Sequence, residues 1–510
     1  MEGRRPESRP HGCGRGLGPE SPAAPGAAGR RPFGSPKRKG TRAMKLRILF
    51  IAGAIAASAH ASAQQAIVPM EGPTLRAPRL TQFDVTSGQY SLLELRLKGF
   101  EMFCTPFNRF DGYGDGLVDP ADPISPGGRP TTSAGWLRAN GLDAQSCFEC
   151  HGIVSNLMIP PRFGVGGAGA IAATSFPGLT HCDIPDNNAN GVAENNGRMI
   201  NPVALFGSGG VELLAKEMTS ELQSLKVKAR TFPGLNVELV THGVNFGTIR
   251  YIEATEDFET SNVVGIEPDL VVRPFGRKGE FSSIRDFAIG AFEMHFGMQP
   301  AEVVGRDMDP DGDNVVNEVF PGELSAIHIY LANLERPREM HDDRPAVQRG
   351  RQVFMEMGCA ACHIPEMRTV NTSLPISFPE VPTDPCENIY MRIDLVNGSA
   401  GFEPDGEGGI LVPLFSDLKR HDMGPELAET AGVPLDPYFI TAKLWGVAGS
   451  APYLHDGRAM TLREAIEMHG GEAAPAAAAF AATTPQDQEN LLIFLRTLRA
   501  PAKPNADLQP

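Results

Sequence analysis

Two copies of one five-residue motif constrain this chain more than any other feature. Residues 147–151 and 359–363 both follow the pattern Cys-x-x-Cys-His. In this pattern two thiols bond the vinyl groups of one porphyrin, and the adjacent imidazole coordinates its iron. With 8 Cys and 12 His among 510 residues, roughly 0.003 copies are expected by chance. The sequence therefore predicts two covalent c-type haems, held by Cys147, Cys150, His151, Cys359, Cys362 and His363.

Other uses of closely spaced cysteines compete with this interpretation. A zinc site, a redox-active dithiol and a disulfide all use such pairs. None of them requires a histidine directly after the second cysteine in both copies. Cys104, Cys182 and Cys386 remain outside the motifs. A Cys182–Cys386 or a Cys104–Cys182 disulfide is compatible with export, and the sequence does not choose between them.

The start of the chain carries an export signal. From Met44 a short basic segment leads into an apolar run over 48–57 and the small residues Ala61-Ser62-Ala63. This order is typical of a secretory signal peptide. We expect 1–43 to be a disordered or untranslated leader, 44–63 to be the signal peptide, and the protein to be periplasmic. Since no later stretch reaches roughly 18 apolar residues, no membrane span is expected.

The charge balance narrows the class of partner. The formal net charge of the whole chain is −15. Residues 64–510 are more acidic still, because the first 63 residues are rich in Arg and Lys. Such a surface opposes binding to nucleic acid or to anionic membranes. It favours a partner with a basic face, such as a small redox protein.

An internal repeat follows the haem motifs. Ser283-Ile-Arg-Asp leads to a Glu-Met-His segment, and Thr461-Leu-Arg-Glu leads to another. Ser283 and Thr461 are typical helix N-caps. His469 falls on the apolar stripe of its helix at i+7, and His295 returns to the same face one turn later. We predict that His295 and His469 are second iron ligands. The alternative is a hydrogen-bonded core histidine.

The repeat also predicts the domain organisation. Each half closes with an aliphatic helix, over 324–334 and over 491–498, which places a boundary near 338–345. We expect a mainly α fold of two cytochrome c-like domains, 64–340 and 341–510, with long irregular loops. The segment 152–280 reads as an insertion in the first domain, with possible strands at 237–240 and 248–252.

A second sequence pattern that predicts a metal site lies in the first of the two predicted domains. The template of an EF-hand calcium loop, D-x-[DN]-x-[DN]-G-x5-E, is matched from Asp307 to Glu318. Hard carboxylate oxygens suit calcium, and Gly312 permits the sharp turn. Since no entering helix is evident, we expect an EF-like loop, with an acidic solvated turn as the alternative. The predicted calcium ligands are Asp307, Asp309, Asp311, Asp313 and Glu318.

The C-terminal part resembles a known family. The run Leu444–Arg458, the segment 461–473, Phe415–Leu418 and His421–Gly424 are similar to the di-haem oxidoreductase family, which is related to bacterial di-haem cytochrome c peroxidases. The resemblance is strong over about 345–500. It implies a C-terminal haem that supplies electrons and an N-terminal haem that reacts with peroxide. His469 stands where those peroxidases have an axial Met, a change that lowers the reduction potential.

These observations together predict a peroxidase-like di-haem c-type oxidoreductase that passes electrons between its haems in the periplasm. Hydrogen peroxide or dioxygen would be the oxidant, and a small redox protein or a quinol-linked donor or acceptor the partner. If His295 and His469 both bind, peroxide requires one ligand to leave. The alternative function is a non-catalytic di-haem electron carrier. Glu253, Glu256 and Glu259 are candidates for a distal acid by placement only.

Overall fold

The computed structural model describes residues 72–75, 77–114, 136–138, 146–151, 183–185, 201–428, 436–502 and 504–508. The predicted leader (1–43) and signal peptide (44–63) lie outside these residues. Within them, no helix has the length and apolarity needed to cross a bilayer. Cys386 is disulfide-bonded and Cys104 carries a free thiol, which argues against the Cys104–Cys182 alternative.

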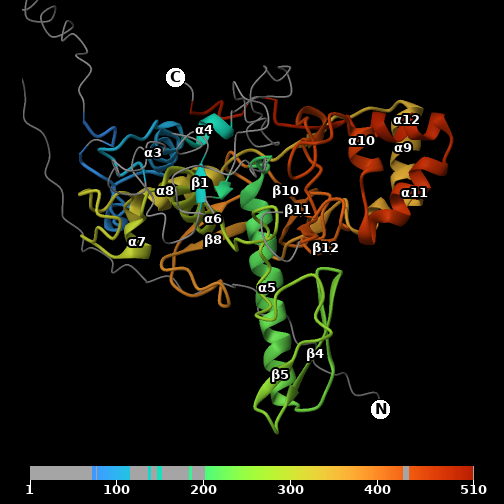
Figure 1. The fold of residues 1–510 in the computed structure, drawn as a ribbon, viewed down its shortest axis with the longest axis horizontal. Helices are drawn as coiled ribbons and strands as arrows, with labels where there is room; N and C mark the ends of the chain where they lie inside the picture. Colours follow the sequence, from blue (N-terminus) through green and yellow to red (C-terminus); the bar gives the residue numbers. More distant parts are fainter. Residues whose placement is uncertain are drawn as a thin grey trace, which may run out of the picture. The chain divides into compact units, whose positions relative to one another are not determined.

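The helices fall into an early and a late group (Figure 1). The early α-helices are α2 (Gln82–Thr86), α3 (Leu92–Cys104), α4 (Cys147–Cys150), α5 (Ser208–Thr231), α6 (Ile284–Ala291), α7 (Ala301–Val304) and α8 (Pro321–Ala332). The late ones are α9 (Pro345–Glu356), α10 (Leu462–Glu467), α11 (Ala474–Ala482) and α12 (Pro485–Leu495). Short 3₁₀ turns are η2 (Cys359–Ala361), η3 (Val447–Gly449) and η4 (Gly471–Ala473), and η1 (Phe292–Phe296) is a π-helical turn.

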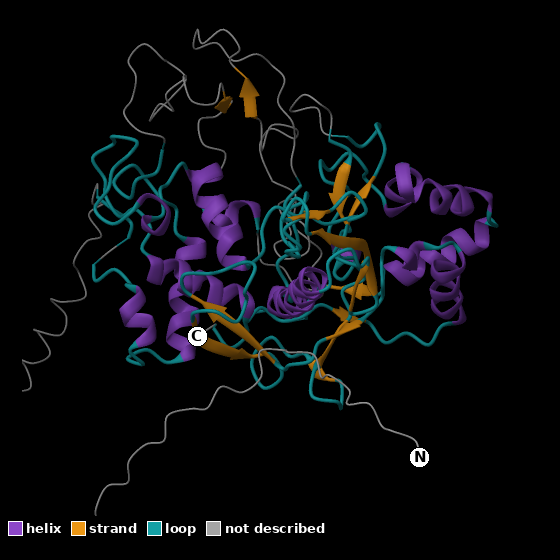
Figure 2. Ribbon diagram, turned by 90° about the horizontal axis from the view of Figure 1, so that it is seen from below, coloured by secondary structure: helices purple, strands orange, loops and turns teal. Residues whose placement is uncertain are grey.

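The strands are short and form separate two- and three-stranded antiparallel sheets (Figure 2). They are β1 (Trp136–Arg138), β2 (Asp183–Pro185), β3 (Val237–Thr241), β4 (Val244–Ile252), β5 (Asp257–Glu259), β6 (Arg338–Glu339), β7 (Met367–Arg368), β8 (Ser373–Ser377), β9 (Ile389–Asp394), β10 (Glu403–Pro404), β11 (Ile410–Val412), β12 (Arg420–Asp422), β13 (Tyr438–Ile440) and β14 (Leu498–Arg499). Their sheet orders are β1-β2, β3-β4-β5, β8-β9, β10-β11-β7, β12-β13 and β14-β6.

The expected mainly α fold with two cytochrome c-like domains is wrong. The described residues are 35% helical and 15% strand, so the fold is mixed α/β. The strands at 237–240 and 248–252 are confirmed as parts of β3 and β4. The predicted irregular insertion, however, also contains the 24-residue helix α5, which runs beside β4 and β5 (Figure 1).

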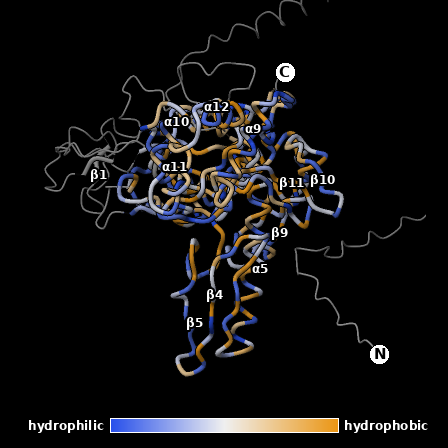
Figure 3. The backbone as a smooth tube through the Cα atoms, turned by 90° about the vertical axis from the view of Figure 1, so that its right-hand side faces the viewer, coloured by the Kyte–Doolittle hydropathy of each residue, from blue (hydrophilic) through white to orange (hydrophobic). Residues whose placement is uncertain are grey.

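The sequence analysis did not predict helix α5, although its apolar residues have the spacing of a helix. Val211, Leu214, Met218 and Leu222 recur at three- and four-residue spacing, and all are buried. Hydrophobic and hydrophilic segments alternate along α5 and β4 in Figure 3. Gly209 and Gly210 in its first turn, and the Gly- and Asn-rich sequence that precedes it, hid the periodicity.

Two pairs of helices cross at a glycine in the same way. A Cβ on Gly99 of α3 would lie 2.0 Å from the carbonyl oxygen of Ala326 in α8, and one on Gly350 of α9 would lie 2.0 Å from that of Asn490 in α12. A side chain at either position would therefore force the backbones apart. Each crossing precedes a haem motif.

Aromatic residues one helical turn after each crossing repeat the same arrangement. Phe103 and Tyr330 have ring centres 5.6 Å apart, and Phe354 and Phe494 have ring centres 5.7 Å apart. Each of these residues lies four positions beyond a residue of its crossing. The internal repeat is thus a repeat of helix packing as well as of sequence.

The buried apolar residues form two clusters. The first is built mainly on α3, α5, α6 and α8, and the second on α9 and α12. Strands β8, β9 and β11, from the second predicted domain, pack in the first cluster. The predicted boundary at 340/341 stays a prediction, but the hydrophobic packing does not divide at that point.

The glycine crossing predicts a sharp mutational effect. Gly350→Ala should lower the free energy of unfolding by about 2 kcal/mol, because overpacking outweighs the gain in helix propensity. Urea denaturation measures this change. Met355→Ala on the same helix is the control, because Met355 is 54% exposed and should shift stability by less than about 0.5 kcal/mol. Equal effects of the two substitutions would contradict a backbone contact at Gly350.

Candidate functional site

A cavity of about 510 Å³ surrounds the second Cys-x-x-Cys-His motif. Its volume falls within the range of roughly 300–1,000 Å³ typical of cofactor sites. Cys359, Cys362 and His363 line it from one element, and His469 lines it from the end of α10. Most of its remaining wall is apolar, with contributions that include Phe354, Leu444, Leu462, Ile466 and Leu491. The cavity can therefore enclose a large apolar group beside both thiols.

His363 is held by a strained backbone. Its Nδ1 lies 3.0 Å from the carbonyl oxygen of Phe415, to which the N–H donates. Phe415 has a φ of 56°, a left-handed conformation that is uncommon for a bulky residue. This hydrogen bond fixes the tautomer and leaves Nε2 available for a metal, the usual arrangement around a ligating histidine.

His469 meets His363 from a different helix. Thr461 is confirmed as the N-cap of α10, and His469 follows the helix with its Nδ1 donating to the Ala465 carbonyl oxygen at 2.7 Å. The ring centres of His363 and His469 are 6.4 Å apart. Imidazoles on opposite sides of one metal, with bonds of about 2.0 Å, would have ring centres roughly 6.3 Å apart. The pair therefore fits a haem iron between them.

Burial keeps both imidazoles in the ligating form. It lowers the pKa of His363 to about 4, assisted by the neighbouring His469. Burial also lowers the pKa of His469. Both rings are therefore neutral at neutral pH, the form that binds metals.

His421 provides a fixed positive charge at the cavity wall. Its Nε2 lies 2.9 Å from Asp417 and its Nδ1 lies 2.8 Å from Glu472. Burial opposes its charge, but the bonds to Asp417, Cys362 and Glu472 outweigh it and raise the pKa of His421 to about 11. An imidazolium therefore stands beside the Cys362 sulfur, 4.0 Å from Nδ1.

His455 and Arg458, two polar residues of the run Leu444–Arg458, have different surroundings. His455 lines the cavity and stacks near Phe439, with ring centres 4.3 Å apart. Arg458 instead donates to Asp456 and to the Glu426 carbonyl oxygen. Arg458 thus stabilises a turn, and His455 faces the space where a cofactor would lie.

The first motif also has a second histidine beside it. Burial lowers the pKa of His151 to about 3, and the neighbouring His295 lowers it further. The Nδ1 of His151 is buried and has no hydrogen-bond partner among the described residues. The structure thus brings together His151 and His295, which lie far apart in the sequence. His151 thus has a second imidazole beside it, as His363 does, but no described residue fixes its Nδ1 as the Phe415 carbonyl fixes that of His363.

His295 lies on unusual helical geometry. Ser283 is confirmed as the N-cap of α6, where it accepts from the Asp286 N–H. The helix does not continue regularly to His295, because residues 292–296 form the π-helical turn η1, which ends at Gly297. Single π-turns inside helices are frequent at functional sites.

A buried cluster of charges anchors the start of α6. Glu212 is fully buried and accepts from the Ile284 N–H at 3.0 Å, from His328 at 2.9 Å and from Lys216 at 2.7 Å. Burial opposes its ionisation, but His328 and Lys216 outweigh it and hold the pKa of Glu212 at about 2. His328 is therefore a hydrogen-bonded core residue.

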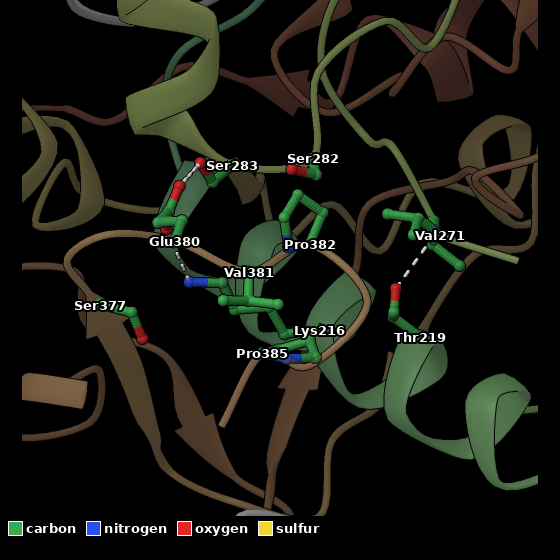
Figure 4. Close-up of a pocket in the computed structure, with 11 residues that line it drawn as sticks. Lys216, Thr219, Val271, Ser282, Ser283, Ser377, Glu380, Val381, Pro382 and Pro385 are labelled. Atoms are coloured by element: carbon green, nitrogen blue, oxygen red, sulfur yellow. Dashed lines mark hydrogen bonds and ion pairs between the residues drawn. The ribbon is translucent and has the colours of Figure 1, made fainter. Parts of the chain in front are cut away.

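A small cavity of about 20 Å³, enough for one water, adjoins this cluster. Figure 4 shows the Lys216 ammonium and the Ser283 hydroxyl directed at the Glu380 carboxylate. The N-cap of α6 is thus tied to the same cluster of charges. These contacts hold the helix that carries His295.

The predicted calcium loop gathers three of its five residues. Carboxylate oxygens of Asp309, Asp311 and Asp313 lie within 4.8 Å of one another. Glu318 is buried, and burial together with these aspartates raises its pKa to about 9. Asp307 instead accepts from the Asn317 side chain at 2.7 Å. The Glu318 carboxylate also accepts from Gln299 N at 2.6 Å, four residues after His295.

Sequence reasoning missed several contacts around these sites. Glu253 and Glu256 are exposed in the turn between β4 and β5, and Glu259 pairs with Arg250. The acid–base contacts at the second motif come instead from Asp417, His421 and Glu472. The four-residue spacing of Asp417 and His421 was the available signal.

Comparison with known proteins supports the C-terminal resemblance. Residues 407–498 match the family described as "Di-haem oxidoreductase, putative peroxidase". No curated protein matches the chain. Two solved structures are similar at a TM-score of 0.25 each. Kuenenia stuttgartiensis hydrazine synthase, pressurised with xenon, is 16% identical and aligns over 50% of this chain and 78% of its own. A MauG-like protein associated with microbial copper homeostasis is 15% identical and aligns over 48% and 77%.

The family match confirms the resemblance seen in the sequence. The matched residues 407–498 include His421, His469 and the cavity-lining residues between them. The two solved structures are too distant to carry an argument. The match covers 92 of the 510 residues, so it shows similarity to the di-haem oxidoreductase family over this part of the chain.

The raised pKa of His421 predicts how stability depends on pH. The folded state favours the protonated ring, so its stabilisation is complete below the unfolded pKa of about 6.5 and is lost as pH rises toward 11. The free energy of unfolding should therefore fall between about pH 6.5 and pH 10. Urea denaturation across this range measures the slope.

His421→Gln should flatten that slope. His341→Gln is the matched control, because the His341 side chain is 90% exposed, and it should keep the wild-type slope. Parallel curves for wild type and His421→Gln would show that the imidazolium between Asp417 and Glu472 does not stabilise the fold.

Proposed function

We propose that this chain is a periplasmic di-haem c-type oxidoreductase that reduces hydrogen peroxide with electrons passed between two covalently bound haems. The observation that carries the proposal is the pairing of each motif histidine with a second histidine of its own repeat, His151 with His295 and His363 with His469. Cys147 and Cys150, and Cys359 and Cys362, are the attachment residues.

The haems would supply one-electron chemistry at iron, and the chain's residues would position and tune it. His363 is oriented by the Phe415 carbonyl, and His469 by the Ala465 carbonyl. The His421 imidazolium places positive charge beside one attachment sulfur, which favours the reduced state of a nearby centre. The apolar cavity wall excludes water.

We assign peroxide binding to the first site. His295 lies in the π-helical turn, and Gly297 follows it with a φ of 60°. We infer that this turn rearranges to a regular α-helical turn when the site opens, which would move His295 away from His151. The second site, whose two imidazoles are both fixed by carbonyl groups, would stay closed and deliver electrons. The electron donor would be a small redox protein with a basic face, or a quinol-linked carrier.

The alternative is a non-catalytic di-haem electron carrier. It is favoured by the opposed imidazoles at the second motif, because two closed haems exchange electrons without binding substrate. Dioxygen is a second possible oxidant in the enzymatic case. These alternatives differ in whether the first iron accepts an external ligand.

Electron paramagnetic resonance and carbon monoxide binding test the proposal on protein expressed with the haem-attachment machinery. Wild type should be low-spin when oxidised, and one haem should bind carbon monoxide after reduction. Pre-reduced enzyme should oxidise reduced cytochrome c with hydrogen peroxide. His295→Ala should make one haem high-spin at rest and remove the need for pre-reduction.

His469→Ala is the matched variant at the other site. It should change the spectrum of the second haem and reduce peroxide turnover by at least about tenfold, because the electron-delivering centre is altered. Two low-spin haems that bind no external ligand in either redox state, with no peroxide turnover, would support the carrier and end the enzymatic proposal.

We also propose that the acidic loop binds calcium and influences the first site. The Asp311 Oδ2 is buried with no hydrogen-bond partner among the described residues. Glu318 links the loop to the Gln299 amide, next to the segment that carries His295. Calcium would neutralise these carboxylates and stiffen that segment.

Calcium titration by calorimetry tests this proposal. Affinity should rise as pH increases toward 9, because the pKa of Glu318 is raised to about 9 and its carboxyl must lose a proton to bind. Glu318→Gln should weaken calcium binding at least about tenfold and remove the pH dependence above about pH 7, leaving that of Asp311, whose pKa is raised to about 7. Asp342→Asn is the control, because Asp342 lies outside the loop and pairs with Arg344. Wild-type protein that takes up no calcium would contradict the proposal.

A further inference from the structure

Besides its histidines, the cavity at the second motif is lined by two cationic side chains. Arg277 comes from the loop between β5 and α6, and Lys443 follows strand β13. The Ile440 N–H donates to the Arg277 carbonyl oxygen at 3.1 Å, and the Lys443 ammonium donates to the Pro274 carbonyl oxygen at 2.8 Å. The two segments are thus joined directly, and both cations belong to one part of the cavity wall.

The Lys443 ammonium has hydrogen-bonding capacity to spare. An ammonium carries three N–H donors, and the Pro274 carbonyl uses one of them. In the part of the chain that the structure describes, Lys443 forms no ion pair with a carboxylate. Burial lowers the pKa of Lys443 to about 8, as expected for a cation with no anion in its surroundings.

The residues that line the cavity carry more positive than negative charge. Glu472 is the one carboxylate among the described lining residues. It accepts from His421, whose charge it shares with Asp417. Arg277 and Lys443 therefore give this wall an excess of positive charge. In a chain whose formal net charge is −15, composition alone does not lead one to expect such an excess.

A haem in this cavity would change the surroundings of Lys443. The porphyrin would displace water that can solvate the ammonium, and most of the remaining wall is apolar. A desolvated ammonium without an anion costs free energy. A haem, however, brings two propionate carboxylates of its own. Carboxylates are acceptor-only groups that form strong charge-assisted hydrogen bonds with Lys and Arg.

We propose that Lys443 and Arg277 bind the propionate carboxylates of the haem at the second motif. Two cations match the two carboxylates in number and in charge. This inference rests on the proposed covalent haem at that motif. Uncompensated negative charge near the iron favours the ferric state, so the two cations would raise the reduction potential. They would thereby offset part of the lowering caused by His469 and support electron delivery from this centre.

Resonance Raman spectroscopy of the haem-loaded full chain tests these contacts, after intact mass spectrometry has confirmed two attached haems. The propionate-bending bands report hydrogen bonds to the haem carboxylates. Lys443→Met and Arg277→Met should each shift one component of these bands and leave the remainder unchanged. In a potentiometric titration, each substitution should lower the equilibrium constant for reducing one haem at least about threefold, because a carboxylate loses its counter-charge.

Lys419→Met is the matched control, since it removes the same charge from a neighbouring segment. Like Lys443, Lys419 is partly buried, and its ammonium donates to a backbone carbonyl oxygen, that of Asn245, at 2.8 Å. Lys419 lies outside the residues that line the cavity, so its substitution should keep the wild-type bands and reduction equilibria. Lys443→Arg should also keep a hydrogen-bonded propionate, which separates loss of the cation from loss of packing.

Two results would overturn the inference. One is haem-loaded Lys443→Met and Arg277→Met with the propionate bands of wild type, even if their reduction equilibria change, because the two residues would then act only as distant charges. The other is a band shift of equal size in Lys419→Met. A chain that carries no haem at the second motif would contradict the proposed function as well, and the mass measurement distinguishes that case.

Discussion

Each haem-motif histidine must meet a second imidazole that lies more than a hundred residues away in the chain. The close helix crossings at Gly99 and Gly350 each fix the helix that leads into a motif against the last helix of its repeat. The aromatic pairs one turn later hold the same register. The two pairs of packed helices, α3 with α8 and α9 with α12, therefore hold the segments that carry the two motifs.

The contacts that hold the second histidine differ between the two motifs. Carbonyl groups fix both imidazoles at the second motif, and carboxylates hold His421 in its charged form beside the cavity. At the first motif His295 lies on a π-helical turn that adjoins the acidic loop through Gln299. In the proposed function this asymmetry would allow one centre to bind an external ligand while the other carries electrons.

The features predicted correctly from the sequence are those that depend on interactions between residues close together in the chain. The N-caps Ser283 and Thr461 are confirmed, because a hydroxyl that accepts from an amide three residues later is a short-range signal. The mainly α fold is wrong, because strands of two to six residues around β7–β13 carry too little periodicity to be recognised. The juxtapositions at Phe415, His421 and Lys443 join distant segments, and no pattern within one segment encodes them.

Intact mass spectrometry of denatured protein, exported from cells that contain the haem-attachment machinery, tests the central claim most directly. Covalent attachment at Cys147/Cys150 and at Cys359/Cys362 predicts a mass increased by two haems, and by one haem when either cysteine pair is replaced with serine. A colourless protein, or one whose mass matches the bare polypeptide, would contradict the account.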